Sequence, residues 1–216
     1  MVRAVRDGEG APVDEFEVFF SFYGLLLGLA AAEILSSLGL LVRERSLRLL
    51  RARSAMLASL TFLIICATWI DAWFVRRHFA LDFSSLWAPI GAATTYYLAA
   101  SVVLPRKAEG FEDLDAYFEH RKRFVVLMLV AAELFVKVIY IPSFAEQFRE
   151  RPMVFWLHAV PLNLMIFVTF AAMYFARGRT ANLAAISAQM ILFVGSYWWA
   201  SYFTDLIRAA YGYPPA

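Results

Sequence analysis

The chain has little charge and almost no cysteine. Charged side chains make up 18% of its 216 residues and the formal net charge is +2, whereas soluble domains carry roughly 25% charged residues. A net charge this small does not favour nucleic acid as a partner. The one cysteine, Cys66, excludes an intramolecular disulfide.

Familiar catalytic and cofactor motifs are also missing from the sequence. It contains no Gly-x-x-x-x-Gly-Lys phosphate loop, no Gly-x-Ser-x-Gly nucleophile elbow and no cysteine cluster of the kind that binds zinc or an iron–sulfur centre. We therefore expect neither a cofactor nor a metal site, and an enzyme is the less favoured class of protein.

Apolar residues, by contrast, are abundant. The chain is 62% hydrophobic and 17% aromatic, which is more apolar surface than one globular core of this size can bury. Apolar segments recur, each close to the roughly 20 residues that cross a bilayer as a helix. Their ranges are 16–42, 54–75, 85–104, 124–144, 153–176 and 181–207. This pattern predicts an all-α integral membrane protein with about six transmembrane helices.

Lysine and arginine placement predicts the orientation in the membrane. Basic residues gather in segments 43–53 and 106–123 and at Arg177 and Arg179, which would share one side of the membrane. Positively charged loops are retained in the cytoplasm, so we expect both termini outside it. The compact architecture with short, arginine-rich loops favours a bacterial inner membrane.

Weak internal similarity suggests a duplication. The tetrapeptide Ala-Ala-Glu-Ile at 31–34 matches Ala-Ala-Glu-Leu at 131–134, and Tyr-Tyr-Leu-Ala at 96–99 matches Tyr-Trp-Trp-Ala at 197–200. The nearly constant offset of about a hundred residues predicts a 3+3 inverted repeat, as in many transporters. A composition rich in alanine and aromatics produces such matches by chance, which is the alternative. The predicted divisions are 1–15 (extracytoplasmic segment), 16–104 (first three-helix unit), 105–123 (cytoplasmic linker), 124–207 (second unit) and 208–216 (tail).

The linker carries its own pattern. Apolar residues recur at helical spacing from position 111 onward, which predicts an amphipathic helix lying along the membrane surface. Arg121, Lys122 and Arg123 follow at its end and are candidates for contact with lipid headgroups. The alternative is that they simply anchor and orient the fourth helix.

Ionisable residues within the apolar segments are the main functional candidates. Glu33 and Glu133 fall near the middle of their helices, where a bare carboxylate costs about 3 kcal/mol or more. Lys137 follows Glu133 by four residues and therefore shares its helix face. One interpretation makes the three part of a path for a proton, an ion or a polar solute. The other makes them polar contacts that hold helices together.

A stripe of small residues marks the first helix. Gly24, Gly28, Ala32 and Ser36 recur at four-residue spacing, which lets another helix approach closely. We expect the partner to be a helix of the same chain, and a second subunit is the alternative.

Scattered polar residues near the ends of other segments form a weaker set. Asp71, His158, Asn163 and Asp205 would line an outer vestibule if their helices converge there. They lack the i, i+4 spacing of a helical metal motif, so interfacial anchoring is the simpler interpretation.

Taken together, the sequence favours a channel or transporter for an ion or small polar solute. The main alternative is a non-catalytic membrane subunit or scaffold that assembles with other proteins. A third possibility is a lipid-acting enzyme that uses His120 or His158 as its acid–base group. The expected partners are membrane lipid and either a second copy of the chain or another membrane subunit.

Overall fold

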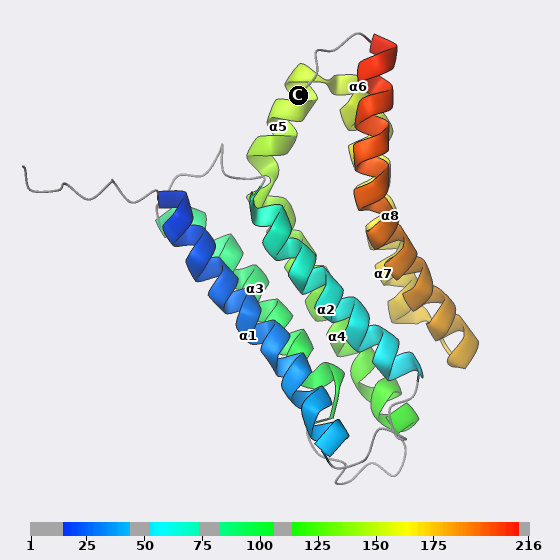
Figure 1. Ribbon diagram of the computed structural model, residues 1–216. Coiled ribbons are helices and arrows are strands. Elements are labelled where there is room, and N and C mark those ends of the chain that lie inside the picture. Colours follow the sequence, from blue (N-terminus) through cyan, green and yellow to red (C-terminus); the bar gives the residue numbers. More distant parts are fainter. Residues whose placement is uncertain (1–14, 44–51, 74–82, 106–113, 212–216) are drawn as a thin grey trace, which may run out of the picture.

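The computed structural model describes residues 15–43, 52–73, 83–105 and 114–211, and this part of the chain contains helices and no strand (Figure 1). The elements in chain order are α1 (Glu15–Arg43), α2 (Ala52–Ala72), α3 (Phe83–Val103), α4 (Leu114–Ile139), α5 (Ile141–Glu150), α6 (Pro152–Val154), the π-helical segment η3 (Phe155–Ala159), α7 (Val160–Phe175) and α8 (Arg179–Tyr211).

The lengths and composition of these helices fit a bilayer. In the described part of the chain, α1, α2, α3, the continuous η3–α7 helix and α8 are each long and apolar enough to cross a membrane. The bent pair of α4 and α5 supplies a sixth span if the two are counted together. The part of the chain that the structure describes is therefore all-helical, and its five to six apolar helices are compatible with a polytopic membrane protein.

The long helices run alternately up and down and define two ends of the molecule (Figure 1). One end holds ring contacts such as Phe16 against Trp73, and we call it the aromatic end. The other holds Arg53 and Lys122, and we call it the basic end. Helix α1 begins at the aromatic end and α8 finishes there, so the first and last described residues lie at the same end of the helices.

Small residues bring α1, α3 and α4 into close contact. Helix α3 presents Ala92, Ala99 and Ala100, all fully buried, and it packs extensively against both α1 and α4. At Gly91 the approach is so close that a Cβ atom would lie 2.6 Å from the Phe135 ring. Helix–helix association in lipid depends on such close packing, because lipid tails are as apolar as the side chains themselves.

Part of the amphipathic linker predicted over 105–123 belongs to a membrane-length helix in the structure. Residues from Leu114 onward form the first turns of α4 and run without a break into its membrane-length part. The break comes instead at the other end, where α4 stops at Ile139 and α5 departs at 56°. Pro142 sits in the first turn of α5 and lacks the N–H needed to continue the α4 hydrogen bonds. The stretch 106–113 lies outside the described residues.

Helices α7 and α8 form a hairpin that packs against α2 and α4. Its turn uses Gly178 in the left-handed conformation, at φ +79°, which only glycine adopts without strain. The first unit pairs α1 closely with α3, whereas the equivalent pair in the second unit, α4 and α8, shares few close contacts among the described residues. The inverted repeat is therefore not confirmed by this arrangement.

Candidate functional site

Helix α4 carries an ion pair inside the bundle. The Lys137 ammonium lies 2.6 Å from the Glu133 carboxylate, one helical turn away. Glu133 is only 9% exposed, so its charge is largely removed from solvent and lipid. The i, i+4 spacing, with glutamate first, is the order that favours such a contact. The sequence-based expectation that these two residues share a face is met in the structure.

Asp71, near the end of α2, accepts hydrogen bonds from two tyrosines of other elements. Its carboxylate accepts a hydrogen bond of 2.8 Å from the Tyr197 hydroxyl on α8. Its backbone carbonyl accepts one of 2.5 Å from the Tyr140 hydroxyl, at the break between α4 and α5. Asp71 also lies close enough to Lys137 and Glu133 to interact with both electrostatically. The residue therefore links α2, α4 and α8 at the aromatic end.

The hydroxyls of Thr68 and Tyr96 form a second contact, between α2 and α3. Thr68 donates to the Ile64 carbonyl one turn earlier and lies 2.9 Å from the Tyr96 hydroxyl on α3. Because a threonine hydroxyl has one proton, Tyr96 is the donor between the two. Tyr96 is fully buried and interacts electrostatically with Glu133. Tyr96 therefore lies within electrostatic range of the α4 ion pair.

Tyr23 of α1 lies beside Thr68 and Tyr140. Its side chain is 1% exposed, and its buried hydroxyl makes no hydrogen bond within the described protein. It lines a cavity of about 10 Å³ together with Thr68, Val136 and Tyr140. That volume is about the minimum that holds one water molecule. A water there would supply the hydrogen bond that the Tyr23 hydroxyl needs, since buried polar groups are almost always partnered.

These side chains form what we call the polar cluster: Tyr23, Thr68, Asp71, Tyr96, Glu133, Lys137, Tyr140 and Tyr197. It contains two carboxylates, one amine and five hydroxyls, which can accept, donate and pass protons over short distances. Sequence reasoning found its charged members and missed the tyrosines. In a chain with 10 tyrosines, only their depth within apolar segments could have singled them out.

Glu33 does not join the polar cluster. Tyr23 and Val136 line the same cavity, so they lie at similar depth. Glu33 comes ten residues after Tyr23 on α1, about 15 Å toward the basic end. Glu133 comes three residues before Val136, about 4.5 Å in the same direction. The two glutamates therefore differ in depth by about 10 Å, and Glu33 is only partly buried.

The small-residue stripe of α1 has a different surrounding from the one expected. Gly24 meets another described helix, where a Cβ atom would lie 2.7 Å from the Trp69 indole nitrogen on α2. Gly28, Ala32 and Ser36 are exposed, and a Cβ at Gly28 would meet nothing within 4 Å. The reason is rotational: each four-residue step advances the stripe by about 40° around α1, which turns it away from α2.

The residues proposed for an outer vestibule have separate surroundings where the structure describes their side chains. Asp71 belongs to the polar cluster. His158 instead lines a separate apolar pocket beside α7 and α8. Asn163 donates 2.7 Å back to the Ala159 carbonyl of its own helix, and the side chain of Asp205 lies outside the described part of α8. Among the described residues, no group of three or more His, Cys, Asp or Glu side chains could hold a metal ion.

At the basic end, Lys122 is buried rather than available to lipid headgroups. It is 3% exposed. Its ammonium donates a hydrogen bond of 2.5 Å to the Ala176 carbonyl and one of 2.8 Å to the Asn182 side-chain oxygen. Ala176 is the C-terminal cap of α7, where unsatisfied carbonyls and the helix dipole attract a cation. Lys122 therefore fastens α4 to the α7–α8 turn. Arg121 and Arg123 are exposed and remain candidates for lipid contact.

Neighbouring side chains extend this fastening to α2. Glu119 forms an ion pair with the buried Arg53 of α2 and lies 3.7 Å from Lys122. The Asn182 amide donates a hydrogen bond of 3.2 Å to the same glutamate. The guanidinium of Arg53 also stands 4.9 Å from the centre of the Phe118 ring, a cation–π contact. We call Arg53, Glu119, Lys122 and Asn182 the basic-end clasp.

Comparison with known proteins adds no identification, because no family model, curated protein or solved structure matches the chain. The arrangement of the side chains is therefore the basis for any functional proposal.

Proposed function

We propose that this protein is a membrane transporter or channel that moves protons, alone or in exchange for a small ion, with Glu133 as its central proton-binding group. The observation that carries the proposal is the Glu133–Lys137 pair, held inside the bundle and next to buried hydroxyls. Ionisable residues within a membrane are expensive and are functional candidates for that reason. A pair needed only for packing could be replaced by apolar side chains at little cost.

The polar cluster suggests how protons reach Glu133. Tyr197 is partly exposed on α8 and bonds Asp71, so the path begins near the surface at the aromatic end. The cavity beside Tyr23 and Tyr140 provides room for one bridging water. We propose that the proton passes from there to Glu133, which interacts electrostatically with both tyrosines. Lys137 places a cation 2.6 Å from the carboxylate that we propose carries the proton.

The proposal changes the role that the sequence suggested for Glu33. A path through both glutamates requires a step of about 10 Å between their depths, and Glu33 lies outside the polar cluster. We therefore assign Glu133 the principal role. We also propose, from the positive-inside rule, that the basic end faces the cytoplasm, since Arg121, Arg123 and Arg179 are exposed there. The bacterial inner membrane and the internal repeat stay predictions.

The test is proton flux in reconstituted vesicles. Purified protein is placed in liposomes containing a pH-sensitive dye, and flux is driven by a potassium diffusion potential. Glu133→Gln keeps the size of the side chain and removes its exchangeable charge, so we expect flux to fall to the rate of protein-free vesicles. Glu150→Gln, at an exposed position of α5, is the matched control and should behave as wild type. Glu33→Gln should have a smaller effect than Glu133→Gln.

Two experimental outcomes would contradict the proposal. Wild-type flux in correctly reconstituted Glu133→Gln protein rules out the carboxylate path. A loss of thermal stability with unchanged flux assigns Glu133–Lys137 to packing alone. Unfolding temperatures are measured on the same samples, so that loss of flux through misfolding is distinguished from loss of the proton-binding group.

A second function has one observation in its favour, namely the exposed face of α1. Gly28, Ala32 and Ser36 offer an open backbone surface of the type that packs against another transmembrane helix. On this proposal the chain is a membrane subunit. Purification in mild detergent distinguishes the two, because a subunit retains a different membrane protein at constant ratio and a self-sufficient transporter does not.

A further inference from the structure

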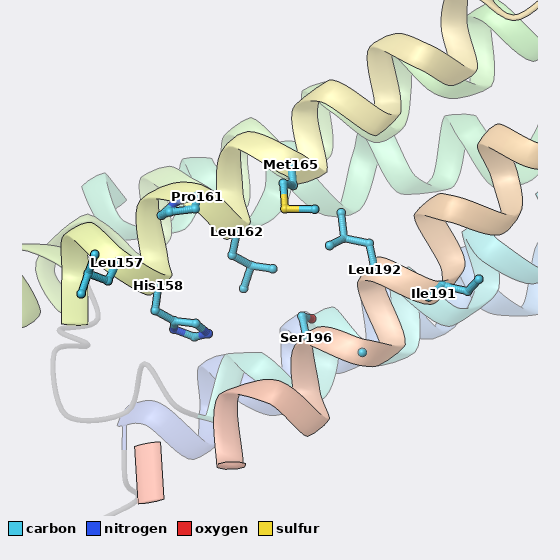
Figure 2. Close-up of a pocket in the computed structure, with 9 residues that line it drawn as sticks. Leu157, His158, Pro161, Leu162, Met165, Ile191, Leu192 and Ser196 are labelled. Carbon is cyan, nitrogen blue, oxygen red and sulfur yellow. The ribbon is translucent and has the colours of Figure 1, made fainter. Parts of the chain in front are cut away.

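A pocket opens between the last two membrane helices, away from the polar cluster. It has a volume of about 350 Å³, which lies within the range of small-ligand sites. Its lining comes from η3, α7 and α8: Leu157, His158, Pro161, Leu162, Met165, Ile191, Leu192, Gly195 and Ser196 (Figure 2). None of these side chains is acidic, and His158 and Ser196 are the only polar ones among them.

The pocket opens toward the surface that lipid would cover. Leu157 is 62% exposed and Ile191 is 73% exposed, and both lie on helices long and apolar enough to cross a membrane. Exposed side chains of such helices face acyl chains rather than water. A molecule that enters this pocket therefore comes from the lipid phase.

The polarity of the pocket changes along its length. His158 and Ser196 lie toward the aromatic end and face the same space (Figure 2). Met165, seven residues after His158 on α7, lies about 10 Å farther into the membrane. Ile191 lies before Ser196 on α8, which runs the other way, so it is also deeper. The pocket thus matches a lipid, with its polar group near the membrane surface and its chain directed inward.

Backbone geometry supports a built site at the polar end. Residues Phe155–Ala159 form a π-helical turn, a feature that often accompanies functional sites in α-helices. Pro161 follows and supplies no N–H to the preceding turn, which leaves an acceptor carbonyl near His158. The Ser196 hydroxyl donates 2.7 Å to the Phe193 carbonyl, so its oxygen is still able to accept a hydrogen bond.

We propose that this pocket binds one acyl chain of a membrane phospholipid, with the glycerol-ester region beside His158 and Ser196. The aliphatic lining favours a flexible chain over a ring, because the leucine, isoleucine and methionine side chains adapt their shape and offer no aromatic surface for stacking. The proposal is independent of proton transport by the polar cluster.

The experiment uses the full-length protein in vesicles containing a trace of phosphatidylcholine with a photoactivatable diazirine in its acyl chain. After illumination, mass spectrometry locates the labelled peptides. We expect labelling concentrated on 157–165 and 191–196. Gly195→Phe adds a ring at the pocket lining, where the Cβ itself meets nothing within 4 Å, and labelling of both peptides should fall several-fold.

Gly39→Phe on α1 is the matched control, since its Cβ also meets nothing within 4 Å, and it should leave the pocket labelling unchanged. If Gly195→Phe lowers the unfolding temperature, Ser196→Ala gives a second measure through a shift of labelling along the chain. Labelling spread evenly over the exposed faces of α1 and α7, or unaffected by Gly195→Phe in folded protein, overturns the proposal. So does displacement of the label by a quinone but not by unlabelled phospholipid.

Discussion

Loss of the Lys122 ammonium should weaken the attachment of the α7–α8 hairpin to the rest of the bundle. In Lys122→Met the apolar stem remains, whereas the hydrogen bonds to the Ala176 carbonyl and the Asn182 oxygen disappear. Each buried polar group left without a partner costs about 1–3 kcal/mol. Relief of the desolvation of Lys122 offsets part of this, so we expect a net loss of about 3 kcal/mol.

The assay is thermal unfolding in a single detergent at fixed scan rate, because membrane proteins often unfold irreversibly. For a chain of this length, about 1 kcal/mol corresponds to about 2–4 °C, so Lys122→Met should unfold about 6–12 °C below wild type. Arg121→Met removes an exposed charge beside it and should change the temperature by no more than about 1–2 °C, because surface substitutions are usually within ±0.5 kcal/mol.

A double-mutant cycle tests the reasoning more sharply. Asn182→Ala removes the oxygen that accepts from Lys122, so the two substitutions should be clearly non-additive, as expected for residues in one hydrogen-bond network. Additive effects, or an equal loss in Arg121→Met, would refute the assignment of Lys122 as a fastening between helices. The lysine would then act only through its charge at the membrane surface.

Two further predictions concern topology and packing. In a background without the native cysteine, a cysteine at Arg179 should resist an impermeant thiol reagent added outside cells, and one at Glu150 should react; the reverse pattern would invert the proposed orientation. Gly91→Leu should lower the unfolding temperature by several degrees, since overpacking costs about 1–3 kcal/mol and its Cβ would contact the Phe135 ring. Gly28→Leu should leave that temperature nearly unchanged, and equal stability of the two variants would contradict the close packing of α3 on α4.

Much of the fold could be predicted from hydrophobic segments alone. The apolar stretches at 16–42 and 54–75 became α1 and α2 within a few residues, because a bilayer fixes the length of a spanning helix. The fourth helix was harder to delimit. Its early turns are charged, and the sequence alone does not reveal that Lys122 finds partners on the α7–α8 turn. Charges in this segment are typical of a membrane surface, whereas the structure buries Lys122 in a contact between helices.

The candidate site illustrates a related difficulty. The Glu133–Lys137 pair is local in sequence, so the i, i+4 rule predicted it. The contacts of Asp71 with Tyr140 and Tyr197 span 69 and 126 residues, and no local pattern indicates them. The stripe on α1 had a clear spacing, but spacing does not say which side of the helix faces the bundle. Helix rotation is set by all the neighbours together, and only the packed structure specifies it.

The positions of the charges also explain how the hairpin of α7 and α8 is attached. Burial of apolar surface drives helices together only weakly in lipid, since leaving a neighbour for lipid changes the environment of an apolar side chain very little. Polar contacts therefore carry more of the specificity there. The α7–α8 hairpin is joined at the basic end by Lys122 and Asn182, and at the aromatic end by Asp71 and Tyr197.

If proton binding at Glu133 alters the charge balance around Asp71, the aromatic-end contact is the one that responds, because it shares the electrostatic neighbourhood of that carboxylate. The basic-end clasp would then serve as the fixed point of the hairpin, and, on the proposed transport function, the contact between α2 and α8 is the place to look for movement.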